Sequence, residues 1–184
     1  SDLANPKYYL YPHYAVGWNY EPDGDHGPTT WDGDCNLEDK VKQSPIDIKG
    51  AEYKADLNEF TMTGYDSVDV TEVLNNGHTV QVTVDDSQTT LSGGGLDGTF
   101  ALAQFHFHWG SVDTQGSEHL LDGKAYPMEV HFVHFNKKYN NLGGAVNKTD
   151  GLAVLGFFFE VGTIAEADDH YKPVFKAFEA VKDA

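Results

Sequence analysis

The residues Gln104-Phe105-His106-Phe107-His108-Trp109 alternate between polar and aromatic side chains with a period of two. This period is typical of a β-strand, in which residues i and i+2 point to the same face. We therefore predict that His106 and His108 project together from one face, with Gln104 beside them. The aromatic side chains are expected on the other face.

A second stretch of the same kind follows at Glu129-Val130-His131-Phe132-Val133-His134. If it pairs antiparallel with the first stretch, His131 completes a triangle with His106 and His108. Three neutral imidazoles leave a tetrahedral zinc ion with one open position for water, and zinc lowers the pKa of that water to about 7. A closed structural zinc site would normally include cysteine thiolates, which both stretches lack.

Two polar residues on these strands are predicted to support the metal ligands. Gln104 lies two residues before His106, and Glu129 lies two residues before His131. Each could accept a hydrogen bond from the second ring nitrogen of its histidine. The alternative is that all three histidines are structural residues of an aromatic core, the usual role of a lone histidine. We favour the metal site because burying so many unpaired polar groups would be costly.

The other polar residues of this region have simpler interpretations. His134 lies on the opposite strand face from His131, so we expect a structural, hydrogen-bonded histidine. His119 follows Glu118 directly and is predicted to make an internal polar contact rather than to bind metal. Taken alone, Glu118 is equally compatible with an exposed surface position.

Strand patterns dominate the chain between its irregular N-terminal stretch, residues 1–35, and its end. Alternating or continuous apolar patterns predict strands at residues 79–84, 100–109, 128–135 and 152–159. The last of these is apolar throughout, which is typical of a strand buried on both faces. Turns are predicted at Asn75-Asn76-Gly77 and Gly93-Gly94-Gly95.

Only the end of the chain has a helical pattern. Apolar residues recur there at helix spacing, at Val174, Phe175, Phe178 and Val181. Asp168-Asp169 precede them as candidate N-cap residues. We therefore expect one domain over residues 1–184, mainly β with peripheral helices (α+β).

The charge composition narrows the classes of partner. The chain has 29 Asp and Glu residues against 12 cationic residues, all of them Lys, and a formal net charge of −17. Such charge opposes binding to nucleic acid and anionic lipid, and the lack of Arg removes the side chain best suited to bidentate phosphate recognition. No apolar run approaches the roughly 18 residues of a membrane span. A small-molecule substrate is the expected partner, and the oligomeric state stays open.

Two features bear on the cellular compartment. The single cysteine, Cys35, is either a buried free thiol or half of a disulfide whose partner lies outside this chain. The triplet Asn147-Lys148-Thr149 is a candidate N-glycosylation site, compatible with a secreted protein. The N-terminus does not resemble a signal peptide, so we expect that any such peptide has been removed.

With these patterns together, the sequence resembles the α-class carbonic anhydrases from about residue 14 to its end. The resemblance rests on long runs, which are Trp18-Asn19-Tyr20, His26-Gly27-Pro28, Trp31, Gln43-Ser44-Pro45-Ile46-Asp47-Ile48, Asn75-Asn76-Gly77-His78, Gln104 to Gly110, Gly116-Ser117-Glu118-His119, Glu129 to His134 and Asp150 to Gly156. It implies a twisted, largely antiparallel central sheet with zinc at the base of a conical cleft.

The resemblance also implies a role for each matching residue. His106, His108 and His131 match the family's zinc ligands, and Gln104 and Glu129 match the residues that hydrogen-bond to them.

Around the ligands, Glu118 matches an acid that orients a threonine, and His78 matches a proton shuttle. Val133 and Val154 match the apolar wall where carbon dioxide lies. Residues that order water in the family's cleft match Tyr20, Asn76 and Gln81.

The expected function is therefore the reversible hydration of carbon dioxide to bicarbonate and a proton by a zinc-bound hydroxide, with His78 exporting the proton. The family continues past the position of Ala184 with strands that carry the threonine and a disulfide partner for Cys35. We accordingly expect a C-terminally incomplete domain, with a companion piece linked through Cys35 as one arrangement. The alternative function is an acidic carbonic-anhydrase-like binding or matrix protein, or an inactive fragment.

Overall fold

The computed structural model describes residues 7–8, 30, 44–84, 88–162 and 172–181. Three predictions fall outside these residues: the cleft position of Tyr20, the pairing of Cys35 and the cap at Asp168-Asp169. Most of the N-terminal stretch predicted to be irregular also lies outside them.

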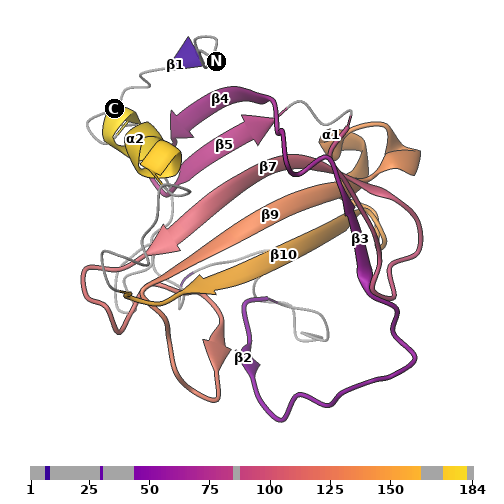
Figure 1. Ribbon diagram of the computed structural model, residues 1–184, viewed down its shortest axis with the longest axis horizontal. Coiled ribbons are helices and arrows are strands. Elements are labelled where there is room, and N and C mark those ends of the chain that lie inside the picture. The colour runs from indigo at the N-terminus through magenta and orange to yellow at the C-terminus, as the bar shows by residue number, and fades with distance from the viewer. Residues whose placement is uncertain (1–6, 9–29, 31–43, 85–87, 163–171, 182–184) are drawn as a thin grey trace.

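The described chain is built mainly of strands, in the order shown in Figure 1. The strands are β1 (Lys7–Tyr8), β2 (Asp47–Ile48), β3 (Phe60–Thr63), β4 (Val70–Asn75), β5 (Val80–Val84), β6 (Thr90–Gly93), β7 (Phe100–Trp109), β8 (Leu120–Leu121), β9 (Met128–Asn136) and β10 (Leu152–Phe159). The helices are the short 3-10 helix η2 (Lys137–Tyr139), α1 (Leu142–Ala145) and α2 (Lys172–Val181). The predicted mainly β fold is thus confirmed.

An antiparallel, curled array forms the body of the sheet. In Figure 1 the strands β4, β5, β7, β9 and β10 lie side by side in that order. Each of these neighbours pairs antiparallel, and β6 joins the beginning of β7 and carries β3. Among the described strands, parallel pairing occurs only in two short ladders, between β1 and β4 and between β2 and β8. The long strand β7 therefore lies in the middle of the array.

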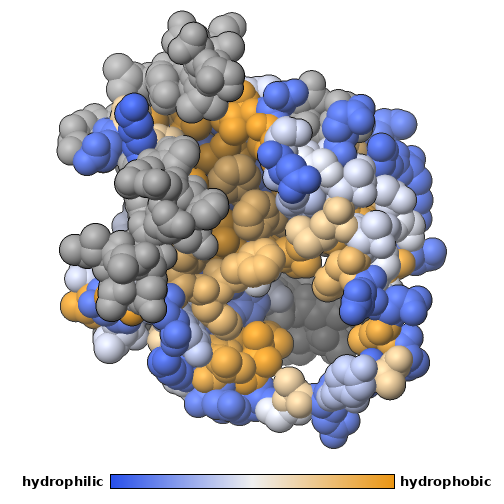
Figure 2. Space-filling model, viewed as in Figure 1, coloured by the Kyte–Doolittle hydropathy of each residue, from blue (hydrophilic) through white to orange (hydrophobic). Residues whose placement is uncertain are grey.

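Alternation along β5 builds the hydrophobic core on one face of the sheet. Val80, Val82 and Val84 are buried, whereas Gln81 and Thr83 between them are half-buried. Helix α2 packs on this cluster through Phe178 and Val181, as the predicted helical spacing requires. Figure 2 shows apolar residues gathered across the centre of the viewed side and hydrophilic residues around its margin.

The turn predictions are confirmed by backbone conformation. Gly77 has φ +86°, and Gly93, Gly94 and Gly95 have φ +75°, +60° and +84°. These left-handed conformations favour glycine because a Cβ atom would clash with the neighbouring carbonyl oxygen.

The environment predicted for one strand is wrong. The strand β10 has the predicted bounds, but it is not buried on both faces: Leu152, Val154 and Phe157 are exposed. The reason is its place at the edge of the array, since among the described residues β10 pairs with β9 alone. An apolar run indicates that a strand can be buried on both faces. Whether it is buried depends on neighbouring segments from elsewhere in the chain.

Candidate metal centre

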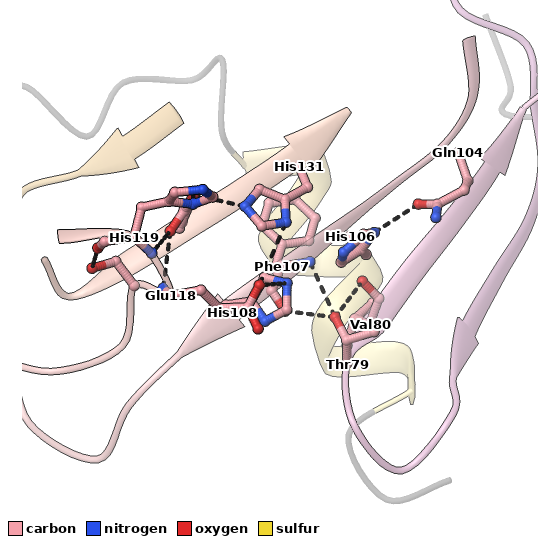
Figure 3. Close-up of polar contacts among 11 residues, drawn as sticks. Thr79, Val80, Gln104, His106, Phe107, His108, Glu118, His119 and His131 are labelled. Carbon is pink, nitrogen blue, oxygen red and sulfur yellow. Dashed lines mark hydrogen bonds and ion pairs between the residues drawn. The ribbon is translucent and has the colours of Figure 1, made fainter. Parts of the chain in front are cut away.

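The register of β7 against β9 brings three histidines together. His106 lies directly opposite His131, so the antiparallel pairing predicted for these strands is confirmed. His108 follows on the same face of β7, and Figure 3 shows the three rings converging. One ring nitrogen from each histidine lies within 4.8 Å of those of the other two, a spacing that could hold a metal ion.

Hydrogen bonds hold two of these rings from behind. His106 donates through Nδ1 to Gln104 Oε1 at 2.8 Å, and His131 donates through Nε2 to Glu129 Oε1 at 2.7 Å. These contacts leave Nε2 of His106 and Nδ1 of His131 for another partner. A hydrogen bond at the far nitrogen fixes both the tautomer and the orientation of a ligand histidine.

The third histidine has a buried nitrogen that the described residues leave unsatisfied. His108 Nε2 makes no hydrogen bond with any described residue, although Glu118 Oε2 lies 3.2 Å away. A buried polar atom without a partner is costly, and a metal ion would satisfy it. Three imidazole nitrogens also form a donor set that suits zinc. The residues present therefore fit a zinc ion.

Burial keeps the rings of His106 and His108 neutral, as metal ligands must be. Burial, followed by repulsion from His108 and His131, lowers the pKa of His106 to about 4. Burial also lowers the pKa of His108, although the neighbouring carboxylate of Glu118 works in the opposite direction. At neutral pH both imidazoles are therefore ready to bind a cation without first losing a proton.

Glu129 organises the polar side of the site. It is 2% exposed and accepts through Oε2 from the backbone N–H groups of Glu118 and His119, each at 2.9 Å. Its Oε1 accepts from the rings of His119 and His131, each at 2.7 Å. Burial alone would raise the pKa of Glu129, but these hydrogen bonds, led by that from His131, lower it to about 2. Glu129 is therefore a carboxylate at neutral pH.

The same contacts decide between two metal-binding arrangements. The atoms of His119, Glu129 and His131 also lie close enough to hold an ion. They are, however, used in hydrogen bonds with one another, whereas His108 Nε2 has no such partner among the described residues. His119 is thus an internal polar contact, as predicted, and the cluster of His106, His108 and His131 is the better metal site.

Comparison with known proteins agrees with this geometry. Residues 26–184 match the family model for eukaryotic-type carbonic anhydrase. The chain is also similar to carbonic anhydrase 1 of Oryctolagus cuniculus, with 44% identity over 145 residues, which cover 77% of this chain and 60% of that protein. The chain belongs to the eukaryotic-type carbonic anhydrase family. It spans about 60% of the length of that curated relative.

Two valines predicted for the substrate wall lie beside the candidate metal centre. Val133 of β9 and Val154 of β10 are directly paired, two residues along their strands from His131 and Gly156 respectively. Alternation therefore places both on the face that carries His131. Val133 is half-buried and Val154 is 51% exposed, so the apolar surface is open to a small molecule.

Two of the residues predicted to order water in the cleft, Asn76 and Gln81, lie in and after the turn that carries His78, the predicted proton shuttle. Asn76 Oδ1 accepts from the backbone N–H groups of His78 and Thr79, at 3.0 Å and 2.9 Å. Gln81, three residues after His78, lies opposite His106 in the pairing of β5 with β7. The turn of Asn76 and His78 thus leads directly into the strand beside the candidate metal ligands.

Sequence reasoning missed two residues near the centre. Gly156 lies opposite His131, and a Cβ atom there would come within 3.1 Å of Glu129 Oε1. The signal was a single glycine inside an apolar strand. The second is Thr79, whose buried hydroxyl bonds the backbone of Phe107, between His106 and His108. No sequence pattern predicted that contact.

Proposed function

We propose that this protein catalyses the zinc-dependent reversible hydration of carbon dioxide to bicarbonate and a proton. The proposal is carried by the three-histidine cluster, in which two rings are held from behind by Gln104 and Glu129 and the third has an unsatisfied buried nitrogen. Membership of the carbonic anhydrase family supports the reaction.

Each residue of the centre has a part in this proposal. His106, His108 and His131 would hold the zinc ion. When bound, zinc supplies Lewis acidity that turns water into a nucleophile near neutral pH. Gln104 and Glu129 fix the tautomer and the orientation of the ligand rings that they contact.

The surrounding residues would handle the substrate and the proton. Val133 and Val154 offer apolar surface beside the ligands, which suits carbon dioxide because it is small and has no net dipole. His78 would carry the proton away, since imidazole takes up and releases protons near neutral pH. Asn76 lies in the turn of His78 and Gln81 lies in the strand that follows it, and both would order water for this proton transfer. The carboxylate of Glu118 lies 3.2 Å from His108 Nε2, at the candidate ligand cluster.

The decisive experiment is a stopped-flow hydration assay on the zinc-loaded protein. We expect turnover that disappears after dialysis against a chelator and returns when zinc is added. His106→Ala should abolish it, whereas the exposed-surface variant Asn147→Gln should not. Turnover that ignores the removal of zinc would contradict the proposal.

The net charge of −17 favours a second candidate, an acidic matrix-type protein that gathers cations. The presence of all three candidate ligands favours the enzyme instead. Tight zinc binding without any turnover, together with binding of many calcium ions, would support the second candidate.

We also propose that this protein is secreted and that it is glycosylated at Asn147. Asn147 of the candidate glycosylation triplet is exposed in the turn after α1, where an oligosaccharide could be attached without disturbing the core. Treatment of the native protein with an N-glycosidase should lower its mass, and Asn147→Gln should remove that shift. Intact mass with and without reductant would reveal whether Cys35 links this chain to a companion piece.

A further inference from the structure

The pairing of β5 with β7 ends next to the metal ligands. The register runs from Thr83 opposite Gln104 to Gln81 opposite His106, and goes no further. Phe107 is the next residue of β7, and its backbone lies between the two histidines of that strand. Its N–H and C=O groups on the β5 side therefore need another partner, because buried backbone groups are seldom left unpaired.

One side chain supplies both partners. The hydroxyl of Thr79 donates to Phe107 O at 2.5 Å and accepts from Phe107 N at 3.1 Å, as Figure 3 shows. Its distance to the alternative acceptor, Val80 O, is longer, at 3.3 Å. Thr79 is 8% exposed, so water does not compete freely for these bonds.

These two bonds act on the peptide groups that join the histidines. The N–H of Phe107 belongs to the peptide group shared with His106, and its C=O belongs to the group shared with His108. Fixing both groups fixes the direction in which each Cα–Cβ bond of the two histidines leaves the strand. The side chain of Phe107 is itself held on the opposite face, 4% exposed and 4.7 Å between ring centroids from Phe178.

The backbone of Thr79 is itself fixed by hydrogen bonds within the turn from Asn76 to Thr79. Asn76 N donates to Thr79 O at 3.1 Å, and Thr79 N donates to Asn76 Oδ1 at 2.9 Å. This closed turn leaves the Thr79 side chain little freedom relative to β7. It also joins the segment that carries His78 to the segment that carries the ligands.

We propose that Thr79 is a positioning residue for the metal centre: its hydroxyl sets the relative orientation of His106 and His108 by clamping the backbone of Phe107. The inference rests on the proposed function, in that it takes these histidines as zinc ligands. In this role Thr79 would act through the backbone of Phe107 and would not itself contact zinc or substrate.

The test compares three variants of the whole chain. Thr79→Val keeps the shape and removes the hydroxyl, and Thr79→Ser restores the hydroxyl. Thr89→Val is the matched control, because Thr89 is also buried, at 2% exposed, and its hydroxyl also bonds a backbone oxygen, that of Gly64. Thr89 lies before β6, which joins β7 at its far end from the histidines.

Two readouts separate positioning from general stability. The zinc dissociation constant, measured by chelator competition, should rise about 10- to 100-fold in Thr79→Val and stay near the wild-type value in Thr79→Ser and Thr89→Val. The visible absorption of the cobalt-substituted protein should change in Thr79→Val alone. Wild-type affinity and an unchanged cobalt spectrum in Thr79→Val would overturn the inference.

A third readout works on the metal-free protein and separates the two proposals. The ring signals of His106 and His108 in NMR spectra should shift in Thr79→Val and not in Thr89→Val. A wild-type chain that binds no zinc contradicts the proposed function, whereas unchanged ring signals in Thr79→Val contradict the positioning role.

Discussion

The two faces of β9 carry one histidine each, and the two histidines have different surroundings. His131 lies on the face of Glu129 and Val133, where it joins two other imidazoles. His134 lies on the other face and is fully buried. Its Nδ1 donates to Ala153 O at 3.1 Å, and its Nε2 accepts from the hydroxyl of Tyr65. The structural role predicted for His134 is therefore confirmed.

The difference lies in how many ring nitrogens have protein partners. Both nitrogens of His134 are hydrogen-bonded, so this ring has none left to offer a metal ion. In His131 only Nε2 is hydrogen-bonded, to Glu129, while Nδ1 lies 3.7 Å from Glu118 Oε2 and faces the cluster. Burial and sequence pattern are similar for the two residues, so it is the pairing of their nitrogens that separates a structural histidine from a candidate ligand.

Removing each ring in turn tests the contrast between His131 and His134 directly. His131→Ala should lower hydration activity at least about a thousandfold, because a zinc ion needs its third imidazole. His134→Gln should keep zinc binding and lose stability instead, because it disrupts a buried hydrogen-bonded pair. Stopped-flow assays and urea denaturation of the two variants measure the two effects. Equal loss of activity in both would erase the distinction.

The second prediction concerns the carboxylate behind His131. In the wild-type chain each carboxylate oxygen of Glu129 accepts two hydrogen bonds. Glu129→Gln replaces one of these oxygens with an NH₂ group, so the two donors that bonded this oxygen would face another donor. We expect zinc affinity to fall about 10- to 100-fold. Chelator competition measures it, with Glu160→Gln as the control, since Glu160 is exposed and its carboxylate lies 3.5 Å from Lys124. An unchanged affinity would show that Glu129 does not support the ligand.

The third prediction uses pH to probe the structural face. Burial lowers the pKa of His134 below its ordinary value of 6.5, so the unfolded chain takes up a proton at a higher pH than the folded one. The free energy of unfolding should therefore be highest above pH 6.5 and should fall as the pH is lowered through that value. Urea midpoints at about pH 7.5 and about pH 5.5 measure this. The fall should be smaller in His134→Gln, and an equal fall would assign the effect to other groups.

The smallest expected effect concerns the space between Gly156 and the carboxylate of Glu129, beside the candidate metal centre. In Gly156→Ala the new Cβ atom would lie 3.1 Å from Glu129 Oε1, so the carboxylate must shift by a few tenths of an ångström. We expect a loss of zinc affinity of about two- to fivefold, smaller than for a change to Glu129 itself. Gly143→Ala is the control, because its nearest atom is Asn141 Oδ1 at 3.4 Å, in the short helix α1. A loss as large in Gly143→Ala would point to a general effect.

Local pattern was enough to predict the strands and the ligand face. The bounds of β7 and β10 agree with the predicted ranges, and those of β9 differ by one residue, because side-chain alternation is a direct consequence of strand geometry. The contacts of Gln104 with His106 and of Glu129 with His131 followed from an offset of two residues on one strand.

Contacts between distant segments could not be predicted in this way. The clamp of Thr79 on Phe107 joins residues 28 apart, and the hydrogen bond of Tyr65 with His134 joins residues 69 apart. The exposure of β10 likewise depends on its having one neighbour among the described strands. Such features arise from the register and order of strands, which no single segment encodes.

Which side chains share a face of each strand follows from the order of residues alone, because the period of two is built into an extended backbone. Which faces meet depends on how the strands assemble. Assembly places His106 opposite His131, leaves space at Gly156 beside Glu129 and brings Thr79 to Phe107. A cluster of ring nitrogens, a hydrogen-bond pair and a buried strand each require groups from separate segments. Their relative positions are set by packing of the whole sheet.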